Sequence, residues 1–300
     1  PSETQGEQGF PSIYIGEQYA VTHYPGAVIT QSFGSNELSF NAAAPDQVAH
    51  FDTVFQQAIA NHVTILAASG DTGTTNFDKQ GRAFSVPSVN WPSSDPLVTS
   101  VGGTWLQDGF RWDPATPTDS SDIVSTETAE PVWNEPPLAD ASGGGVSSLF
   151  ATPSFQANIS SSLLQGHRGV PDLAWNAAVD GGCLIYTSFG GIRVGWHILG
   201  GTSASTPQIA GLVALTNQLA HDQGKGSVGY LNPYLYQLPA RDFSDIVPQT
   251  FGPGAVTLDN NQQYGSSIPG YPVTTGYDLT TGLGRPNVYN FVYDLAAALP

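Results

Sequence analysis

Apolar runs and one amphipathic stretch alternate along the first third of the chain. Three runs that end in small residues predict buried strands, at 26–34, 63–70 and 96–103. The stretch 45–62 predicts a helix, because its apolar side chains recur at helical spacing: Val48, Phe51, Phe55, Ala58 and Ile59. Such alternation favours an α/β fold, in which helices cover both faces of a parallel sheet.

The second half of the chain adds further elements. Residues 203–221 predict a helix with an apolar stripe, formed by Ile209, Leu212, Val213, Leu215 and Leu219, and a last helix is expected near 286–298. The runs 183–189 and 192–198 are separated by two glycines and predict a hairpin. Stretches 104–180 and 240–285 lack clear periodicity and are interpreted as loops. We therefore expect a single domain over 1–300, with 1–25 as a peripheral start segment.

A large excess of acid dominates the composition. The 300 residues include 25 Asp and Glu against 8 Lys and Arg, a formal charge of −17, which would repel nucleic acid and anionic membranes. An acidic habitat would suit this charge, although general solubility explains it equally well. No apolar run predicts a membrane span, and the first residues lack the pattern of a signal peptide. The single cysteine, Cys183, excludes an internal disulfide and is interpreted as a small core residue.

Ser203 is the first candidate for chemistry. It follows Gly200 and Gly201 at the predicted start of a helix, where backbone N–H groups point outward and favour negative charge. A serine at this position has its own N–H ready to stabilise an oxyanion. The alternative is a simple helix cap, which is the usual role of Ser or Thr before a helix.

Asp71 is the second candidate, and it comes directly after the run 63–70. In parallel sheets ligands collect at the carboxyl ends of strands, which is where this carboxyl group should lie. It could cap a loop, or partial burial could raise its pKa so that a protonated carboxyl donates to an oxyanion. None of the six histidines lies in a pattern that would make it the base of a Ser-His-Asp triad.

Six sequence blocks together carry a family resemblance. In order along the chain, these blocks are AASGDTG (67–73), SGGGVS (142–147), RGVPDLAWNA (168–177), GGTSAS (200–205), GYLNPYLYQL (229–238) and TTGYDLTTGLG (274–284). Their order and spacing resemble the sedolisin, or serine-carboxyl peptidase, family. The resemblance runs from about residue 26 to the C-terminus and implies a subtilisin-like fold that cleaves proteins at acidic pH.

The resemblance also implies roles for individual residues. Ser203 matches the nucleophile, and Asp71 matches the aspartic acid of the oxyanion hole. The strand end Ser32, Phe33 and Gly34 matches the segment that pairs with substrate backbone, although the family usually has Trp where this chain has Phe33. The block Ser142, Gly143 and Gly144 matches the opposite wall of the cleft, so that an extended peptide would lie between the two segments.

The family's base is missing from this sequence. That base is a glutamate oriented by an aspartate four residues later, and none of the seven glutamates is followed by such an aspartate. In the family the helix with this pair precedes the region that matches residue 1, so we expect the chain to be N-terminally incomplete. Without the base we expect weak or no activity, because such residues act as a unit. The partners expected are a polypeptide substrate and the protein's own missing N-terminal segment or propeptide.

A calcium site is implied at the C-terminal loops. The family pattern gives Asp245 and Asp278 as carboxylate ligands and the backbone carbonyls of Ile246, Thr274 and Gly276, with a water to complete about six oxygens. Taken without the family, these residues would be ordinary surface turns.

Three functions therefore remain open. The first is a secreted serine-type endopeptidase of an acidic milieu. The second is a calcium-stabilised peptide-binding remnant without catalysis. The third is a carbohydrate-active enzyme, which would use the aromatic and acidic residues but lacks an evident carboxylate pair.

Overall fold

A computed structural model describes residues 9–39, 45–78, 82–111, 124–135, 138–189, 191, 193–251, 255–257, 259–260 and 268–300. At its centre lies a parallel sheet in the order β1-β3-β5-β12. These strands are β1 (Val28–Gln31), β3 (Thr64–Ala68), β5 (Thr99–Thr104) and β12 (Leu173–Asn176). Every residue of β3 and β5 is buried, as expected for strands covered on both faces.

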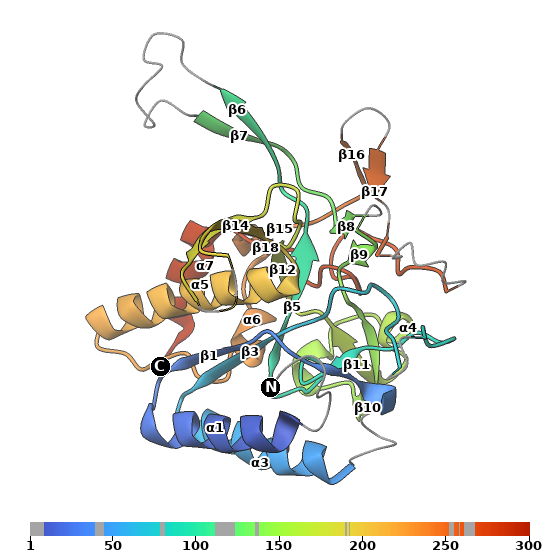
Figure 1. Cartoon of the computed structure of the whole chain (residues 1–300). Helices are drawn as coiled ribbons and strands as arrows, with labels where there is room; N and C mark the ends of the chain where they lie inside the picture. Colours follow the sequence, from blue (N-terminus) through green and yellow to red (C-terminus); the bar gives the residue numbers. More distant parts are fainter. Residues whose placement is uncertain are drawn as a thin grey trace.

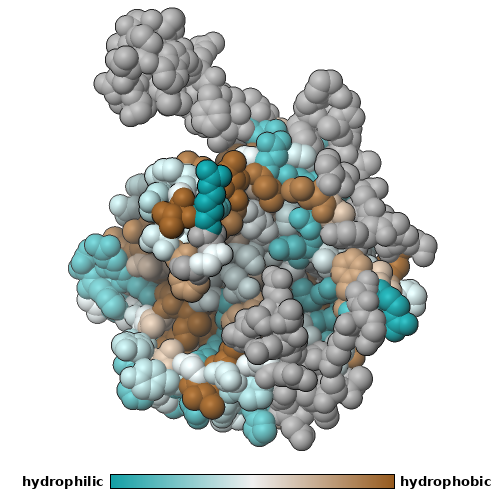
Figure 2. All heavy atoms as spheres, viewed as in Figure 1, coloured by the Kyte–Doolittle hydropathy of each residue, from teal (hydrophilic) through white to brown (hydrophobic). Residues whose placement is uncertain are grey.

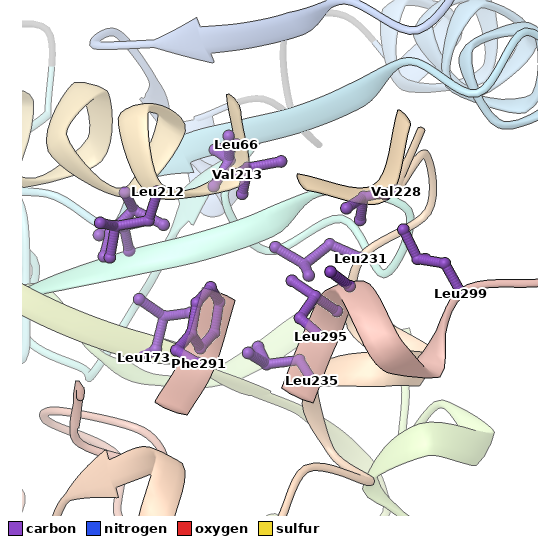
Figure 3. Close-up of a cluster of buried hydrophobic side chains, with 14 residues drawn as sticks. Leu66, Leu173, Leu212, Val213, Val228, Leu231, Leu235, Phe291, Leu295 and Leu299 are labelled. Atoms are coloured by element: carbon purple, nitrogen blue, oxygen red, sulfur yellow. The ribbon is translucent and has the colours of Figure 1, made fainter. Parts of the chain in front are cut away.

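One face of the sheet is covered by the long helix α5 (Thr202–Asp222), which contacts all four strands, and by α7 (Val288–Ala298) beside it. Figure 3 shows the apolar cluster between these layers, where Leu66 and Leu173 of the sheet lie near Val213 and Phe291 of the helices. The Lys225 side chain donates to three carbonyl oxygens at the end of α7. This cluster is the larger of the two main cores.

The opposite face is covered by α1 (Phe10–His23) and α3 (Pro45–Ala60), which pack against each other below the sheet in Figure 1. Aromatic rings dominate this second core, with Phe10, Phe51, Phe55 and Trp91 in mutual edge or tilted contacts. Helices on both faces of a parallel sheet confirm the α/β, subtilisin-like fold class.

The other described strands form short antiparallel pairs outside the central sheet. They are β2 (Ser35–Asn36) with β4 (Asn90–Trp91), β6 (Gln107–Arg111) with β7 (Val124–Ala129), β8 (Asn134–Glu135) with β9 (Asp140–Ala141), β10 (Gly145–Ala151) with β11 (His167–Val170), β13 (Cys183–Thr187) with β14 (Gly195–Leu199), β15 (Phe243–Ser244) with β18 (Arg285–Pro286), and β16 (Gln249–Phe251) with β17 (Ala255–Thr257). Single helical turns complete the list: Ser154–Gln156, α4 (Ser161–Leu164), α6 (Asn232–Leu235) and Ala240–Asp242.

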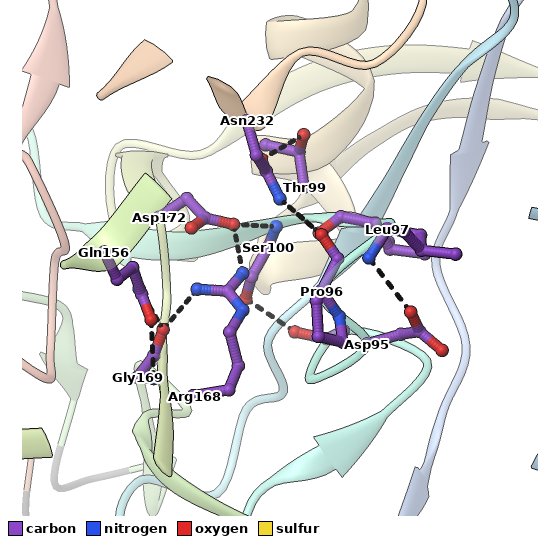
Figure 4. A network of polar contacts seen from close by, with 12 residues as sticks. Asp95, Pro96, Leu97, Thr99, Ser100, Gln156, Arg168, Gly169, Asp172 and Asn232 are labelled. Carbon is purple, nitrogen blue, oxygen red and sulfur yellow. Dashed lines mark hydrogen bonds and ion pairs between the residues drawn. The ribbon is translucent and has the colours of Figure 1, made fainter. Parts of the chain in front are cut away.

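A buried ion pair fixes the last strand of the sheet. Arg168 and Asp172 are fully buried and paired, and Asp172 Oδ2 also accepts from Ser100 N of β5 at 2.7 Å. Gln156 donates to the carbonyl oxygen of Gly169 at 2.8 Å, so the turn before β12 is held from several sides (Figure 4). Through Asp172 Oδ2, which accepts from Ser100 N, the network joins β5 to the turn before β12, while Arg168 Nε has no hydrogen-bond partner among the described residues.

Three sequence interpretations need correction. The start segment 1–25 contains α1 in its described part, and Phe10 and Val21 of α1 are buried in the second core. The loop prediction for 104–180 is wrong in part, because this stretch supplies β12 of the central sheet. Cys183 lies in a strand, as expected, but is only half-buried.

No helix in the described part of the chain is both long and apolar enough to cross a bilayer.

Candidate active site

The carboxyl ends of β1 and β3 and the start of α5 meet at one place. β1 leads into Ser32, β3 leads through Ser69 and Gly70 to Asp71, and α5 begins at Thr202, so Ser203 is its second residue. Parallel strands necessarily bring their carboxyl ends to the same edge of the sheet. The fold thereby brings together residues that are far apart in the sequence.

Asp71 is bound to the beginning of α5. Its Oδ1 accepts a hydrogen bond from Thr202 N at 2.7 Å and another from the Thr202 hydroxyl at 2.8 Å. That hydroxyl also accepts from Gly70 N at 3.1 Å. Burial raises the pKa of Asp71 above its usual range, while the two bonds from Thr202 lower it by less. A raised pKa favours the protonated carboxyl, which can donate a hydrogen bond.

Gly201 is required by the close approach of Asp71. Its φ is +85°, and a Cβ placed on it would lie 2.7 Å from Asp71 Oδ2. The Gly201 N–H donates to the carbonyl oxygen of Ala177 at 2.6 Å, which ties the turn to the end of β12. A side chain at position 201 would therefore displace the carboxyl group.

Ser203, the second residue of α5, is half-buried. Its carbonyl oxygen accepts a hydrogen bond from the Ser32 hydroxyl at 2.9 Å, which links α5 to the end of β1. The Ser203 hydroxyl forms no hydrogen bond with any described residue, including the six histidines, and its backbone N–H has no described acceptor. The N–H and hydroxyl are thus available to a ligand.

The residues predicted to pair with substrate, Ser32, Phe33 and Gly34, begin next to Ser203 but differ in their exposure to solvent. Ser32 and Gly34 are exposed, whereas the ring of Phe33 turns inward and meets Phe10 edge-on at 6.1 Å between centroids. Only the backbone and Ser32 are therefore presented to the solvent side.

The block Ser142, Gly143 and Gly144, predicted to form the opposite wall of the cleft, packs closely against neighbouring backbone. Gly143 N donates to the carbonyl oxygen of Gly70 at 2.8 Å, and a Cβ on Gly143 or Gly144 would collide with backbone carbonyls. The Ser142 hydroxyl is buried, donates to the carbonyl oxygen of Thr280 and accepts from Gly103 N. The block lies next to Gly70 and Asp71, but Ser142, Gly143 and Gly144 are buried in the described structure.

Two further acids, Asp140 and Glu135, lie on the same side of the site as Asp71. Burial raises the pKa of Asp140, and the nearby charges of Asp71 and Glu135 raise it further. Glu135 is itself buried and accepts hydrogen bonds from Trp133 Nε1, Val179 N and Asp180 N. Burial and the two neighbouring carboxylates therefore favour the protonated form of Asp140.

Three of the expected metal ligands, Thr274, Gly276 and Asp278, lie in one loop, and Asp245 contacts this loop. Asp278 is buried, and its Oδ2 accepts from Thr274 N at 3.0 Å, while Asp245 Oδ2 accepts from Gly276 N at 2.9 Å. The carbonyl oxygens of Ile246, Thr274 and Gly276 accept no hydrogen bond from a described residue. Two carboxylates and three free carbonyls are the oxygen donors that a hard cation takes. The described residues contain no cluster of three or more His, Cys, Asp or Glu that could hold a metal.

Sequence reasoning missed Thr202. Thr before a helix predicts only a cap, yet this side chain bonds Asp71, which is 131 residues away. Only the packing of β3 against α5 brings the two together.

Known proteins resemble the chain over nearly its whole length. Kumamolisin of Bacillus sp. (strain MN-32) is 35% identical over 285 residues, which are 93% of this chain and 44% of kumamolisin. Tripeptidyl-peptidase 1 of Canis lupus familiaris is 33% identical over 288 residues, covering 92% of this chain and 43% of that protein. The chain thus spans less than half the length of these relatives. No family model matches it.

A solved structure agrees with these relatives. Pseudomonas sedolisin, a serine-carboxyl proteinase solved with two molecules of pseudo-iodotyrostatin, superposes with a TM-score of 0.75 at 27% identity. The alignment covers 98% of this chain and 70% of that one.

Proposed function

Because the chain belongs to the sedolisin family of serine-carboxyl peptidases, we propose that it hydrolyses peptide bonds as a serine-type endopeptidase. Ser203 is the nucleophile of this proposal, and Asp71 is the acid of the oxyanion hole. The observation that carries it is the pair of hydrogen bonds between Asp71 and Thr202, which hold an acid of raised pKa next to the free hydroxyl and N–H of Ser203.

The reaction would proceed through an ester on Ser203. The Oγ of Ser203 bonds to the carbonyl carbon of the peptide, and its proton passes to a base and from there to the departing amine. Negative charge on the carbonyl oxygen is met by the Ser203 N–H and by a protonated Asp71. Water then hydrolyses the ester and restores the hydroxyl.

The base of this proposal is the glutamate of a Glu-x-x-x-Asp pair. A glutamate suits the task at acidic pH, because carboxylates titrate near pH 4 and an imidazole would be fully protonated there. The 300 residues contain no Glu-x-x-x-Asp, so we expect them alone to cleave peptides slowly or not at all.

An acidic, extracellular setting accords with the charge and with Asp71. The formal charge of −17 at neutral pH falls as carboxyls protonate, which relieves repulsion within the fold. The same change supplies the proton that Asp71 needs in order to donate.

Calcium is the proposed cofactor. Asp245, Asp278 and the carbonyls of Ile246, Thr274 and Gly276 would hold the ion and neutralise the buried Asp278 carboxylate. When bound it supplies structural stabilisation of the two loops rather than chemistry at Ser203.

A peptide-cleavage assay at acidic pH tests the function. We expect that a preparation containing the Glu-x-x-x-Asp pair cleaves an unfolded protein and that Ser203→Ala abolishes cleavage. Cleavage that survives Ser203→Ala refutes the nucleophile. Robust cleavage by the 300 residues alone, lost in Ser203→Ala, refutes the requirement for that pair.

A second candidate is a non-catalytic, calcium-stabilised peptide-binding protein. The exposed strand end at Ser32 and Gly34 beside Ser203 favours it, because an extended peptide can pair there without any base. It predicts binding of extended peptides with no turnover under any condition.

A further inference from the structure

The β13–β14 hairpin carries a face of apolar side chains that no described residue covers. Leu184 lies opposite Ile198, and Tyr186 lies opposite Trp196, so all four point to the same side of the two strands. They are 61%, 58%, 58% and 66% exposed, respectively. We call these four residues the hairpin face. In Figure 2 hydrophobic side chains gather over the upper part of the molecule, where Figure 1 places β14.

The two aromatic residues form the centre of the hairpin face. The rings of Tyr186 and Trp196 pack edge to face at 5.5 Å between centroids. Phe189 and Val194, near the turn, extend the apolar surface at 74% and 58% exposure. A contiguous apolar surface of this kind, rather than isolated exposed residues, is typical of a binding surface.

The hairpin is also free of negative charge. Residues 183–199 contain no Asp or Glu and include Arg193, in a chain whose formal charge is −17. The hairpin itself therefore contributes no acidic side chain that would raise the cost of apolar contact. The hairpin face would accept uncharged, apolar groups.

The position of the hairpin relates it to Ser203. Its second strand ends at Leu199, and two glycines connect it to Thr202 and the start of α5. The base of the hairpin adjoins the end of β12, since Gly201 N donates to Ala177 O. β12 is one edge strand of the central sheet and β1 is the other. Ser32 follows β1, and its hydroxyl donates to the carbonyl oxygen of Ser203. The hairpin and Ser32 therefore flank Ser203 from opposite edges.

We propose that the hairpin face is a docking surface for an extended, apolar segment of the polypeptide substrate, on the side of the scissile bond opposite to Ser32–Gly34. The proposal rests on the proposed peptidase function. In the described structure β13 and β14 pair only with each other, so a strand edge is available beside the apolar face. An extended segment can pair with such an edge and place alternate side chains on the face. Long, unfolded polypeptides would then be preferred over short peptides.

Binding to an inactive variant tests the proposal without cleavage. In the Ser203→Ala background, Tyr186→Thr/Trp196→Thr removes both rings while threonine keeps the preference for a strand. Tyr24→Thr is the matched control, because Tyr24 is also 58% exposed but lies at the end of α1 on the other side of the sheet. The probe is fluorescently labelled, reduced and carboxymethylated lysozyme, and the readout is its Kd by anisotropy.

We expect the double variant to raise the Kd by about tenfold or more, and Tyr24→Thr to leave it unchanged. In the cleaving preparation, the same double variant should raise KM for the unfolded protein and leave kcat/KM for a tetrapeptide anilide unaltered. An unchanged Kd overturns the proposal.

Two other outcomes also overturn it. A dimer in sedimentation velocity that the double variant dissociates would assign the face to a second copy of the chain. Co-sedimentation with phosphatidylcholine vesicles that the double variant loses would assign it to a lipid surface. Failure of the peptidase function is distinguishable, because the expected change in Kd would then remain without any cleavage.

Discussion

Asp71 accepts two hydrogen bonds from Thr202, the residue directly before Ser203. Through these bonds the end of one central strand fixes the start of the longest described helix, and an acid is held beside a free serine. Asp71 and Thr202 are 131 residues apart in the sequence. The relationship is a product of the fold, and it makes the site sensitive to changes at Asp71, Gly201 and Ser203.

Substitution of Asp71 should separate its charge from its hydrogen-bonding role. In a cleaving preparation we expect Asp71→Ala to lower kcat by about 10²–10³-fold, because one donor to the oxyanion is lost. Asp71→Asn can still donate through its amide and should retain more activity, with a weaker fall toward neutral pH. Steady-state kinetics between pH 3 and pH 7, in roughly unit steps, check this. Equal loss in both variants would show that hydrogen-bond donation is not the role of Asp71.

Gly201 should tolerate no side chain. Gly201→Ala combines a φ of +85° with a Cβ 2.7 Å from Asp71 Oδ2, so we expect roughly 1–3 kcal/mol of destabilisation together with loss of activity. Gly211→Ala in the same helix is the control, since nothing lies within 4 Å of the added Cβ. That change should leave activity intact and stabilise by about 1 kcal/mol, as helix propensity predicts. Urea unfolding measures both; similar values for the two variants would contradict the close approach.

The chain should be more stable in mild acid than at alkaline pH. Burial raises the pKa of Glu17 and of Asp95 to about 7 each, well above the values in an unfolded chain. Between the unfolded and folded pKa values the folded state binds more protons, so its stability falls as pH rises through about 7. We expect Tm to be roughly 5 °C or more higher at pH 5 than at pH 8.

Glu17→Gln should weaken this dependence on pH. Glutamine cannot ionise and can still accept the hydrogen bond that Gln31 donates to Oε1. The difference in Tm between pH 5 and pH 8 should therefore shrink in the variant. Glu37→Gln provides a control at a second buried glutamate, which accepts hydrogen bonds from Ser147 Oγ, Ser148 N and Ser148 Oγ. A pH dependence unchanged by Glu17→Gln would refute the role of this carboxyl.

Calcium should raise Tm, and a chelator should reverse the effect. At a free concentration of 100 times Kd, the ion adds about 2.7 kcal/mol to the stability of the folded state. Asp278→Asn removes one carboxylate and should weaken the calcium dependence, whereas Asp259→Asn, an acid outside the expected ligands, should not. Differential scanning calorimetry with and without chelator measures this. A Tm that calcium leaves unchanged would mean that the two loops bind no ion.

Local pattern was sufficient for several elements, and it singled out Asp71 and Ser203 as candidate site residues. The stretch 45–62 has its apolar residues on one side and forms α3 over Pro45–Ala60, and 203–221 lies within α5 at Thr202–Asp222. Asp71 and Ser203 are candidates because each follows a strong local signal: a buried strand precedes Asp71, and a glycine turn at the start of a helix precedes Ser203.

Other elements are determined by contacts distant in sequence. α1 buries Phe10, Glu17 and Val21 on one side, and a carboxyl group within that set disrupts the apolar pattern. β12 follows Pro171 in a polar stretch and is recognised as a strand only through its pairing with β5. The contact of Thr202 with Asp71 likewise depends on the packing of α5 over the sheet.

A crystal structure of the protein with a peptide aldehyde tests the central claim most directly. We predict a covalent bond between Ser203 Oγ and the aldehyde carbon, with the resulting oxygen about 2.6–3.1 Å from both Asp71 Oδ2 and Ser203 N. An aldehyde bound elsewhere, or bound to Ser203 with its oxygen turned away from Asp71, would contradict the account.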